Sequence, residues 1–276
     1  MSPDSSTAPR ADGDGTGPVP AKAAASLRGR AVLVVGCRGR MGAMLCRRGK
    51  AAGLDMRGVD VPLTDAVLAP ACKDAALVLL CVPAAVFADV AATVCAHLPA
   101  TAILADITSV KVRPLQQMEA IWPGPVVGTH PLFGPATPDE DGLPVTVTPG
   151  RTAREEDTAL VEALFRTLGC STFRATADEH DRAMARVQNM NFITNLAYFA
   201  LLAGQEDLLP YITPSFRRRL HAAEKMLTED GTMFTGLFEA NPYSHEAVRQ
   251  YRKMLNVAAA GDIELLCRRA QWWWKK

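Results

Sequence analysis

Short apolar runs alternate with longer helical stretches over the first 170 or so residues. Residues 31–35 are wholly apolar, which is typical of a strand buried on both faces of a parallel sheet. A glycine-rich segment and a helical stretch to about residue 52 follow this run. The same pattern predicts strands at 56–60, 77–82, 101–105, 125–128 and 145–148, with helices at 84–97 and 154–168. This alternation predicts βαβ units and a doubly wound sheet.

The pattern changes after about Ala175, beyond which we identify no strand. Apolar residues at helical spacing predict helices at 178–204, 214–228, 231–239 and 245–271. We therefore expect an α/β Rossmann-like doubly wound sheet followed by an all-α C-terminal dimerisation domain. The predicted boundaries are a disordered tail over 1–27, a nucleotide-binding domain over 28–175 and a helical domain over 176–276.

Composition and charge exclude several classes of function. The chain has 276 residues, with 30 Lys+Arg against 29 Asp+Glu. This balance provides no general field for nucleic acid or an anionic membrane. The apolar run 75–88 is interrupted by Pro83 and is too short to span a bilayer. Seven scattered cysteines without a CxxC pair predict neither a disulfide framework nor a metal site, and they favour the reducing cytoplasm.

Gly36, Gly39 and Gly42 form a variant of the dinucleotide-binding fingerprint between a predicted strand and a predicted helix. The first glycine allows a tight turn, the second lets backbone amides approach a pyrophosphate, and the third lets the helix pack on the strand. The pyrophosphate would lie at the N-terminus of the helix. We therefore assign the intervening loop residues to the cofactor as well: Cys37, Arg38, Arg40 and Met41.

Asp60 ends the next predicted strand, 18 residues beyond Gly42. An acid at this place hydrogen-bonds the ribose 2′-hydroxyl and repels a 2′-phosphate, so we expect NAD rather than NADP. The alternative is a helix-cap or turn aspartate, and Arg38 or Arg40 could instead reach a phosphate. Further cofactor contacts are assigned to the end of the strand that follows: Cys81, Val82 and Pro83.

Two segments that follow predicted strands carry reactive side chains, namely Asp106–Lys111 and Gly128–Pro135. Ligand sites of open α/β sheets lie at this edge. His130 lies among Gly and Pro residues of the second segment, which we interpret as a loop. A histidine in a rigid loop beside a nicotinamide site is a candidate general base.

Four motifs together resemble the prephenate dehydrogenase family, most nearly the enteric type that is usually fused to a chorismate mutase. They are GCRGRMG at 36–42, DITSVK at 106–111, GTHPLFGP at 128–135 and EHDRAMARVQ at 179–188. The resemblance covers about Arg30 to Arg252. Only a short segment precedes the glycine loop, so we expect no mutase domain in this chain.

The resemblance implies an NAD-dependent oxidative decarboxylation of a cyclohexadienyl substrate. Hydride leaves ring C4 while the ring carboxylate departs as CO2. His130 matches the family histidine that accepts the proton of the C4 substituent. Ser109 matches a serine that helps to orient this histidine and the substrate, and Lys111 is given a minor role.

A dianionic substrate requires a local cationic patch on a protein of net charge +1. By resemblance, Arg217 and Lys225 match arginines of the family, Lys225 matching the one that binds a substrate carboxylate. Helical geometry instead places Arg218 on one face with Lys225. A solvated basic face is the alternative. We also place Gln188 and Phe192 of the long predicted helix beside the substrate.

Two positions depart from the family pattern. Lys225 stands where many members have arginine, and Phe192 stands where members usually carry a second histidine. These changes favour 4-amino-4-deoxyprephenate, a substrate of antibiotic precursor biosynthesis. Prephenate, as used in tyrosine biosynthesis, is the alternative, and arogenate is a third option. A 3-hydroxyacid dehydrogenase, an imine reductase and a non-catalytic NAD-binding protein are the competing interpretations.

Two further interpretations concern the helical half. His180 and Asp181 are shared with the family, but their position favours helix initiation and packing over proton transfer. Long apolar faces predict a homodimer through this domain, as the resemblance also implies. We assign the apolar end Trp272–Trp274 to packing against a partner.

Overall fold

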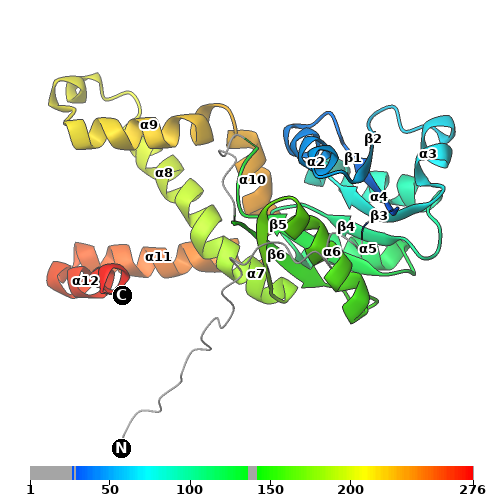
Figure 1. The fold of residues 1–276 in the computed structure, drawn as a ribbon. Helices are drawn as coiled ribbons and strands as arrows, with labels where there is room; N and C mark the ends of the chain where they lie inside the picture. Colours follow the sequence, from blue (N-terminus) through cyan, green and yellow to red (C-terminus); the bar gives the residue numbers. More distant parts are fainter. Residues whose placement is uncertain (1–26, 28, 136–141, 276) are drawn as a thin grey trace, which may run out of the picture.

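A seven-stranded sheet forms the centre of the first half of the chain (Figure 1). The computed structural model describes residues 27, 29–135 and 142–275. The strand order is β2-β1-β3-β4-β5-β6-β7, and every neighbouring pair is parallel except β5 with β6. The strands are β1 (Ala31–Val35), β2 (Asp55–Val59), β3 (Ala75–Leu80), β4 (Ile103–Asp106), β5 (Val126–Pro131), β6 (Leu143–Pro149) and β7 (Cys170–Arg174).

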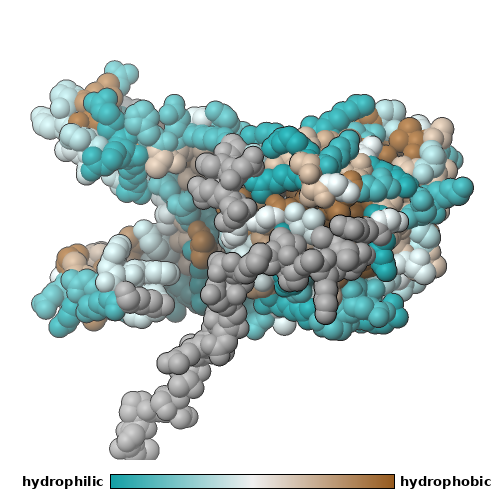
Figure 2. All heavy atoms as spheres, in the orientation of Figure 1, coloured by the Kyte–Doolittle hydropathy of each residue, from teal (hydrophilic) through white to brown (hydrophobic). Residues whose placement is uncertain are grey.

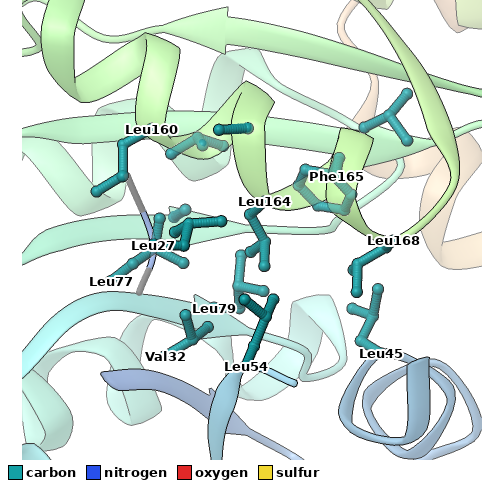
Figure 3. Close-up of a cluster of buried hydrophobic side chains, with 14 of the residues drawn as sticks. Leu27, Val32, Leu45, Leu54, Leu77, Leu79, Leu160, Leu164, Phe165 and Leu168 are labelled. Atoms are coloured by element: carbon teal, nitrogen blue, oxygen red, sulfur yellow. The ribbon is translucent and has the colours of Figure 1, made fainter. Parts of the chain in front are cut away.

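Helices cover both faces of this sheet because its strands are apolar on both sides. One face packs against α2 (Arg40–Ala51) and α6 (Glu155–Thr167). Figure 3 shows this cluster, in which Leu164 of α6 lies near Leu79 of β3, and Leu45 of α2 lies near Leu168. The other face packs against α3 (Asp65–Cys72), α4 (Phe87–Cys95) and α5 (Val112–Ile121). The doubly wound sheet predicted from the sequence is confirmed.

The second half of the described chain is helical (Figure 1). It projects from the sheet as two arms, α8 leading to α9 in one and α11 leading to α12 in the other. The elements are α7 (Ala177–Met184), a π-helical segment (Ala185–Asn189), α8 (Met190–Leu201), α9 (Pro214–Thr228), α10 (Gly231–Ala240), α11 (Ser244–Ala259) and α12 (Ile263–Ala270). Short 3₁₀ segments lie at Ala84–Val86, Glu206–Tyr211 and Gln271–Trp274. None of the helices among the described residues is long and apolar enough to cross a bilayer.

Several predicted boundaries were wrong. The helix expected over 178–204 is divided by the π-helical segment, and the one expected over 245–271 is interrupted before α12. Gly261 has φ +89° at that interruption, a conformation that ends a helix. The structure adds β7 and the helices α3 and α5, for which the sequence analysis predicted no element.

The predicted disordered tail over 1–27 lies outside the described residues except for its last member. Leu27 is only 1% exposed and packs in the cluster of Figure 3, so it belongs to the folded core. Its apolar side chain is removed from water by this packing, which stabilises the folded state.

Two glycines set the geometry between β1 and α2. Gly36 has φ +88°, and a Cβ there would lie 2.4 Å from the carbonyl oxygen of Cys81. A Cβ at Gly42 would lie 2.3 Å from the carbonyl oxygen of Gly36. Both contacts are with backbone, which cannot move aside as a flexible side chain can. The tight turn and the close approach of helix to strand therefore both require glycine.

We expect Gly42→Ala to lower the free energy of unfolding by about 2 kcal/mol or more, because the added methyl group separates β1 from α2. Urea denaturation followed by circular dichroism measures this change. Gly236→Ala is the matched control, since Gly236 lies inside α10 and a Cβ there meets nothing within 4 Å. That substitution should raise stability by about 0.5–1 kcal/mol through helix propensity. Equal effects at the two positions would contradict this account.

Candidate active site

The predicted functional segments lie at one edge of the sheet. Strands β1, β3, β4 and β5 are parallel, so their carboxyl ends lie together. The glycine loop follows β1, Cys81 follows β3, and the segment 107–111 follows β4. His130 is the penultimate residue of β5. Parallel pairing therefore brings the candidate cofactor loop and the candidate base to the same edge.

The glycine loop is held by Asp60, which follows β2. Its carboxylate accepts hydrogen bonds from the backbone amide of Arg38 at 2.8 Å and from that of Val61 at 2.9 Å. The loop amides of Gly36 and Cys37 donate to the carbonyl oxygen of Val59. A carboxylate has further acceptor positions beyond these two bonds. Asp60 can therefore hold the loop and still receive a ribose hydroxyl.

His130 lies within β5, opposite Thr146 of β6, and not in the predicted loop. Its ladder position fixes the backbone, and the side chain is 4% exposed. The Nδ1 atom lies 2.9 Å from Nε2 of His180. The two rings meet edge to face, with centroids 5.1 Å apart. His180, 50 residues away in the chain, is therefore the direct partner of the candidate base.

His180 is oriented by Asp181, its neighbour in α7. The Nδ1 atom of His180 lies 2.7 Å from Oδ1 of Asp181. The same carboxylate accepts the backbone amides of Lys111 at 2.7 Å and Val112 at 2.9 Å, at the start of α5. An anion is stabilised at a helix N-terminus by these amides and by the helix dipole. Asp181 thus anchors α7 to α5 and fixes His180 at once.

The order of partners determines the tautomers of both histidines. Asp181 can only accept, so Nδ1 of His180 carries a proton and donates it. When both imidazoles are neutral, Nε2 of His180 presents a lone pair, which accepts from the Nδ1–H group of His130. Nε2 of His130 is left as an unprotonated acceptor, and it makes no hydrogen bond within the part of the chain that the structure describes. This nitrogen is the one available to act as a base.

Burial and nearby positive charge keep His130 neutral. Burial lowers the pKa of His130 well below its ordinary value of 6.5, and His180 and Lys111 lower this pKa further. A charged imidazole would be poorly solvated in this position and would face another cation. The unprotonated form that general-base catalysis requires is therefore the stable one.

Lys111 and Asp106 form a fully buried ion pair next to this chain of partners. Nζ of Lys111 lies 2.5 Å from Oδ2 of Asp106 and 3.2 Å from the hydroxyl of Thr108. Burial lowers the pKa of Lys111, while Asp106 and Asp181 oppose this shift. Oδ1 of Asp106 is buried without a hydrogen-bond partner among the described residues. The ammonium group of Lys111 is paired with the buried carboxylate of Asp106, so we assign Lys111 a structural role in the site.

Ser109 does not orient His130 in this structure. Its side chain makes no hydrogen bond among the described residues, whereas Thr108, its neighbour, bonds Asp106 and the carbonyl oxygen of Val110. The contact with His130 is made by His180, and the role of Ser109 toward the substrate stays a prediction. The position of Ser109, two residues before Lys111, keeps it at the edge of the sheet that carries the site.

The predicted cationic patch on α9 is divided. Lys225 lies near the end of α9 that adjoins the nucleotide-binding half, with Nζ 4.0 Å from Oδ2 of Asp230. Arg217 lies two turns of helix, about 12 Å, away from Lys225. Arg218 bonds the hydroxyl of Ser215. Lys225 is therefore the cation of this set that lies beside the nucleotide-binding half.

Phe192 and Gln188 occupy the helices beside α7. Phe192 is 2% exposed and stacks on Phe234 of α10, with ring centroids 5.4 Å apart. Gln188 lies in the π-helical segment, and its Oε1 atom is buried without a hydrogen-bond partner in the described residues. A buried orphan acceptor is costly, so it marks Gln188 as a residue with unused hydrogen-bonding capacity.

Comparison with known proteins agrees with this geometry. Residues 47–172 match the family described as prephenate dehydrogenase, nucleotide-binding domain. This part of the chain is therefore similar to the nucleotide-binding domain of that family. The chain is 28% identical over 238 residues to a T-protein of Enterobacter agglomerans, covering 84% of this chain and 62% of that protein. It is 27% identical to a cyclohexadienyl dehydrogenase of Zymomonas mobilis, covering 71% of this chain and 72% of that protein.

A solved family structure shares the fold. Prephenate dehydrogenase from A. aeolicus, in complex with hydroxyphenyl propionate and NAD⁺, superimposes with a TM-score of 0.70 at 20% identity. The similarity covers 88% of this chain and 92% of that one. The chain spans less than two thirds of the length of the T-protein that it matches. The expected family resemblance and fold are thereby confirmed.

His180 and Asp181 are the site residues that the sequence analysis missed. Their helix begins with Thr176, whose hydroxyl accepts the amide of Glu179 while the Glu179 carboxylate accepts the amide of Thr176. The sequence analysis assigned the pair to helix initiation because of its position at the start of the predicted helix, and this capping box is what begins the helix. Both roles hold, since the cap fixes the first turn from which His180 reaches His130. The signal available in the sequence was the pair His180 and Asp181, which the resemblance shares with the family.

We expect nitrogen-15 NMR of histidine-labelled protein to show His130 neutral at pH 6.5, with its proton on Nδ1. Free imidazole side chains are about half protonated at this pH. Because the unfolded chain is protonated first, His130 contributes its full stability above about pH 6.5, and this contribution declines as pH falls toward the lower folded-state pKa. The variant His130→Asn assigns the signal. A midpoint at or above 6.5 would contradict the inferred tautomer chain.

Proposed function

We propose that this protein is an NAD-dependent dehydrogenase that oxidatively decarboxylates a prephenate-type cyclohexadienyl substrate. The observation that carries the proposal is the chain His130–His180–Asp181, which leaves a neutral imidazole nitrogen open at the edge of the sheet that bears the glycine loop. Similarity to the prephenate dehydrogenase family supports the same reaction class.

The residues present fit a dinucleotide. The backbone at Gly36 and Gly42 is packed too closely for a Cβ. A pyrophosphate-binding turn requires such close packing of strand, loop and helix. Asp60 would receive the ribose hydroxyls, and Cys81, Val82 and Pro83 border the loop from the end of β3. NAD, when bound, supplies the hydride acceptor. The carboxylate of Asp60 favours NAD over NADP because it would repel a 2′-phosphate.

His130 acts as the base for the C4 substituent of the substrate. As the C4–H pair leaves as hydride, Nε2 of His130 takes the hydroxyl proton and a C4 carbonyl forms. Cleavage of the bond from C1 to the ring carboxylate releases CO2, and its electron pair aromatises the ring and passes to the C4 oxygen. His130 returns the proton to that oxygen. Substrate and products thus balance, with no net proton left on the protein.

His180 and Asp181 stabilise the protonated state in between. When Nε2 of His130 gains a proton, its Nδ1 proton can pass over 2.9 Å to Nε2 of His180. The positive charge then lies next to Asp181, 2.7 Å from Nδ1 of His180. A base whose pKa is lowered by burial is a weak acceptor on its own, so this transfer is what makes it effective.

The substrate class follows from charge and from the family. Lys225 is the exposed cation beside the nucleotide-binding half, and it would meet a substrate carboxylate as a point charge. Lys111 is paired with Asp106 and is not available to the substrate. Relatives are named for cyclohexadienyl and arogenate/prephenate substrates, which supports prephenate or arogenate as the substrate.

A second candidate is 4-amino-4-deoxyprephenate. Phe192 is buried against Phe234, so the position where family members usually carry a second histidine presents an apolar ring without hydrogen-bonding capacity. This is the observation that favours an altered substrate. His130 can accept a proton from an ammonium group as well as from a hydroxyl group, and so suits either substrate.

We also propose that the chain forms a homodimer through its helical half. Large apolar side chains are exposed on both arms, which Figure 2 shows separated by an open notch. A groove of about 690 Å³ between α8 and the pair α11 and α12 is lined by Val187, Met190 and Tyr251 among others. Exposed apolar surface of this extent marks an association site.

All seven cysteines are free thiols, which fits a cytoplasmic placement.

The proposed reaction is tested by NADH formation at 340 nm with prephenate, arogenate and 4-amino-4-deoxyprephenate in parallel, with NAD and with NADP. We expect turnover with NAD and a preference for one cyclohexadienyl acid. A tenfold preference for prephenate would remove the amino substrate. Absence of turnover with all three would favour a non-catalytic NAD-binding protein, and equal efficiency with NADP would refute the role of Asp60.

Within the same assay, His130→Asn should lower kcat about 10²- to 10⁴-fold and His180→Phe about 10- to 100-fold, with small changes in KM. Phenylalanine keeps the ring contact with His130 but removes the acceptor at Nε2 and the donor to Asp181, which retains the amides of Lys111 and Val112. His97→Phe is the control, because His97 pairs with Asp65 away from the site. Unchanged turnover in His130→Asn would exclude this mechanism.

Light scattering of the full chain at micromolar concentration tests the dimer. We expect a mass about twice 29.6 kDa, because the exposed apolar side chains of the two arms lose contact with water on association. A mass near 30 kDa would exclude the homodimer under these conditions.

A further inference from the structure

Asp230 lies at the joint between α9 and α10. It is the residue before Gly231, the first of α10, and its backbone amide donates to the carbonyl oxygen of Lys225 near the end of α9. Aspartates at this position commonly cap the helix that follows, but the side chain of Asp230 makes no such bond. The carboxylate is 16% exposed and points instead toward another part of the chain.

The carboxylate of Asp230 faces two cations that belong to different halves of the protein. Oδ1 accepts a hydrogen bond from Nη2 of Arg40 at 3.0 Å, across 190 residues of sequence. Oδ2 lies 4.0 Å from Nζ of Lys225. Arg40 is the first residue of α2, directly after the glycine loop, and Lys225 is on α9. One carboxylate thus joins the start of the nucleotide-binding helix to the helix that carries the candidate substrate cation.

Both cations remain accessible to ligands. The side chain of Arg40 is 63% exposed and that of Lys225 is 53% exposed, whereas Asp230 is mostly covered. Without the carboxylate, the two positive groups would face each other with nothing between them to offset their repulsion. Such repulsion would separate the C-terminal end of α9 from the glycine loop.

We propose that Asp230 is a positioning residue for substrate binding: its carboxylate, shared between Arg40 and Lys225, holds the end of α9 over the nucleotide-binding half. This inference rests on the proposed function in assigning a substrate carboxylate to Lys225. It also changes the expected role of Arg40, which pairs with Asp230 across the two halves and was predicted from sequence to contact the cofactor.

The arrangement accounts for the choice of residues at the joint. Lys225 meets Asp230 without a hydrogen bond, so its ammonium group can turn to a substrate carboxylate while the carboxylate of Asp230 stays bonded to Arg40. The hydrogen bond from Arg40 to Asp230 fixes the position of the end of α9. The contact of Asp230 with Lys225 offsets the positive charge of the ammonium group. Dinucleotide contacts through Gly36, Gly42 and Asp60 do not involve this bridge.

The test compares Asp230→Asn, Asp230→Glu and Arg40→Gln with the unmodified full chain. We expect Asp230→Asn to raise the substrate KM roughly three- to tenfold, with kcat and the NADH dissociation constant, measured by fluorescence, within about twofold. Asp230→Glu should restore the KM to within about twofold of the unmodified value, because it keeps the charge. Arg40→Gln should raise the KM as Asp230→Asn does, and the double variant should be no worse than the poorer single one.

Asp74→Asn is the matched control. Asp74 directly precedes β3 and pairs with Arg57 of β2, so both residues belong to the nucleotide-binding half. This variant removes a carboxylate–guanidinium pair that does not link the two halves. Additive effects of the Arg40 and Asp230 substitutions, an unchanged KM in Asp230→Asn, or a loss confined to kcat would each overturn the proposal.

Hydrogen exchange of the ligand-free protein separates this proposal from the proposed function. We expect faster exchange at the first turns of α2 and α10 in Asp230→Asn and in Arg40→Gln, and no change there in Asp74→Asn. If the unmodified chain turns over no cyclohexadienyl acid and this pattern still holds, the reaction is excluded and the bridge stands. If exchange at both turns is unaffected, the bridge is excluded whatever the assay shows.

Discussion

The chain of hydrogen bonds from Asp181 through His180 to His130 is the interaction on which the site depends. Its members are positioned by two constraints: the ladder of β5 places His130, and a helix capped at Thr176 places His180 and Asp181. Asp181 also receives two amides at the start of α5, so it is held by the sheet half while it belongs to the helical half. A shift of either half would therefore change the tautomer and the orientation of the candidate base.

Charge is compensated locally throughout this region. The buried ammonium of Lys111 is matched by Asp106, which lets a cation lie close to His130 without leaving an uncompensated buried charge. That cation in turn helps to lower the pKa of His130 and keeps it unprotonated. At the outer side, Asp230 serves two exposed cations at once. In the proposed function, a chain of net charge +1 would thus bind an anion through the arrangement of a few groups, with no excess of positive charge.

The expected sheet, the strand before the glycine loop and the helices α9, α10 and α11 follow from local hydrophobic periodicity. Elements with weaker patterns were missed. Strand β7, with the sequence CSTFR, is short and half exposed, and α3 contains Pro70. Periodicity also could not show the division of the long helix at the π-helical segment, because the apolar spacing continues through it. The placement of His130 in a loop was wrong for a related reason: Gly and Pro around it suggested a turn, while pairing with β6 made the segment a strand.

The sequence by itself determined the class of the fold, the dinucleotide loop and the identity of His130 as the candidate base, because these depend on residue type and on spacing along the chain. The tertiary structure alone decided what each of these residues contacts. His130 and His180 are 50 residues apart, and Arg40 and Asp230 are 190 apart. Such pairs form when parallel strands align their ends and the helical half closes on them, and no local pattern encodes that distance. Ser109 lies closer to His130 in sequence than His180 does, yet the fold gives the contact with His130 to His180.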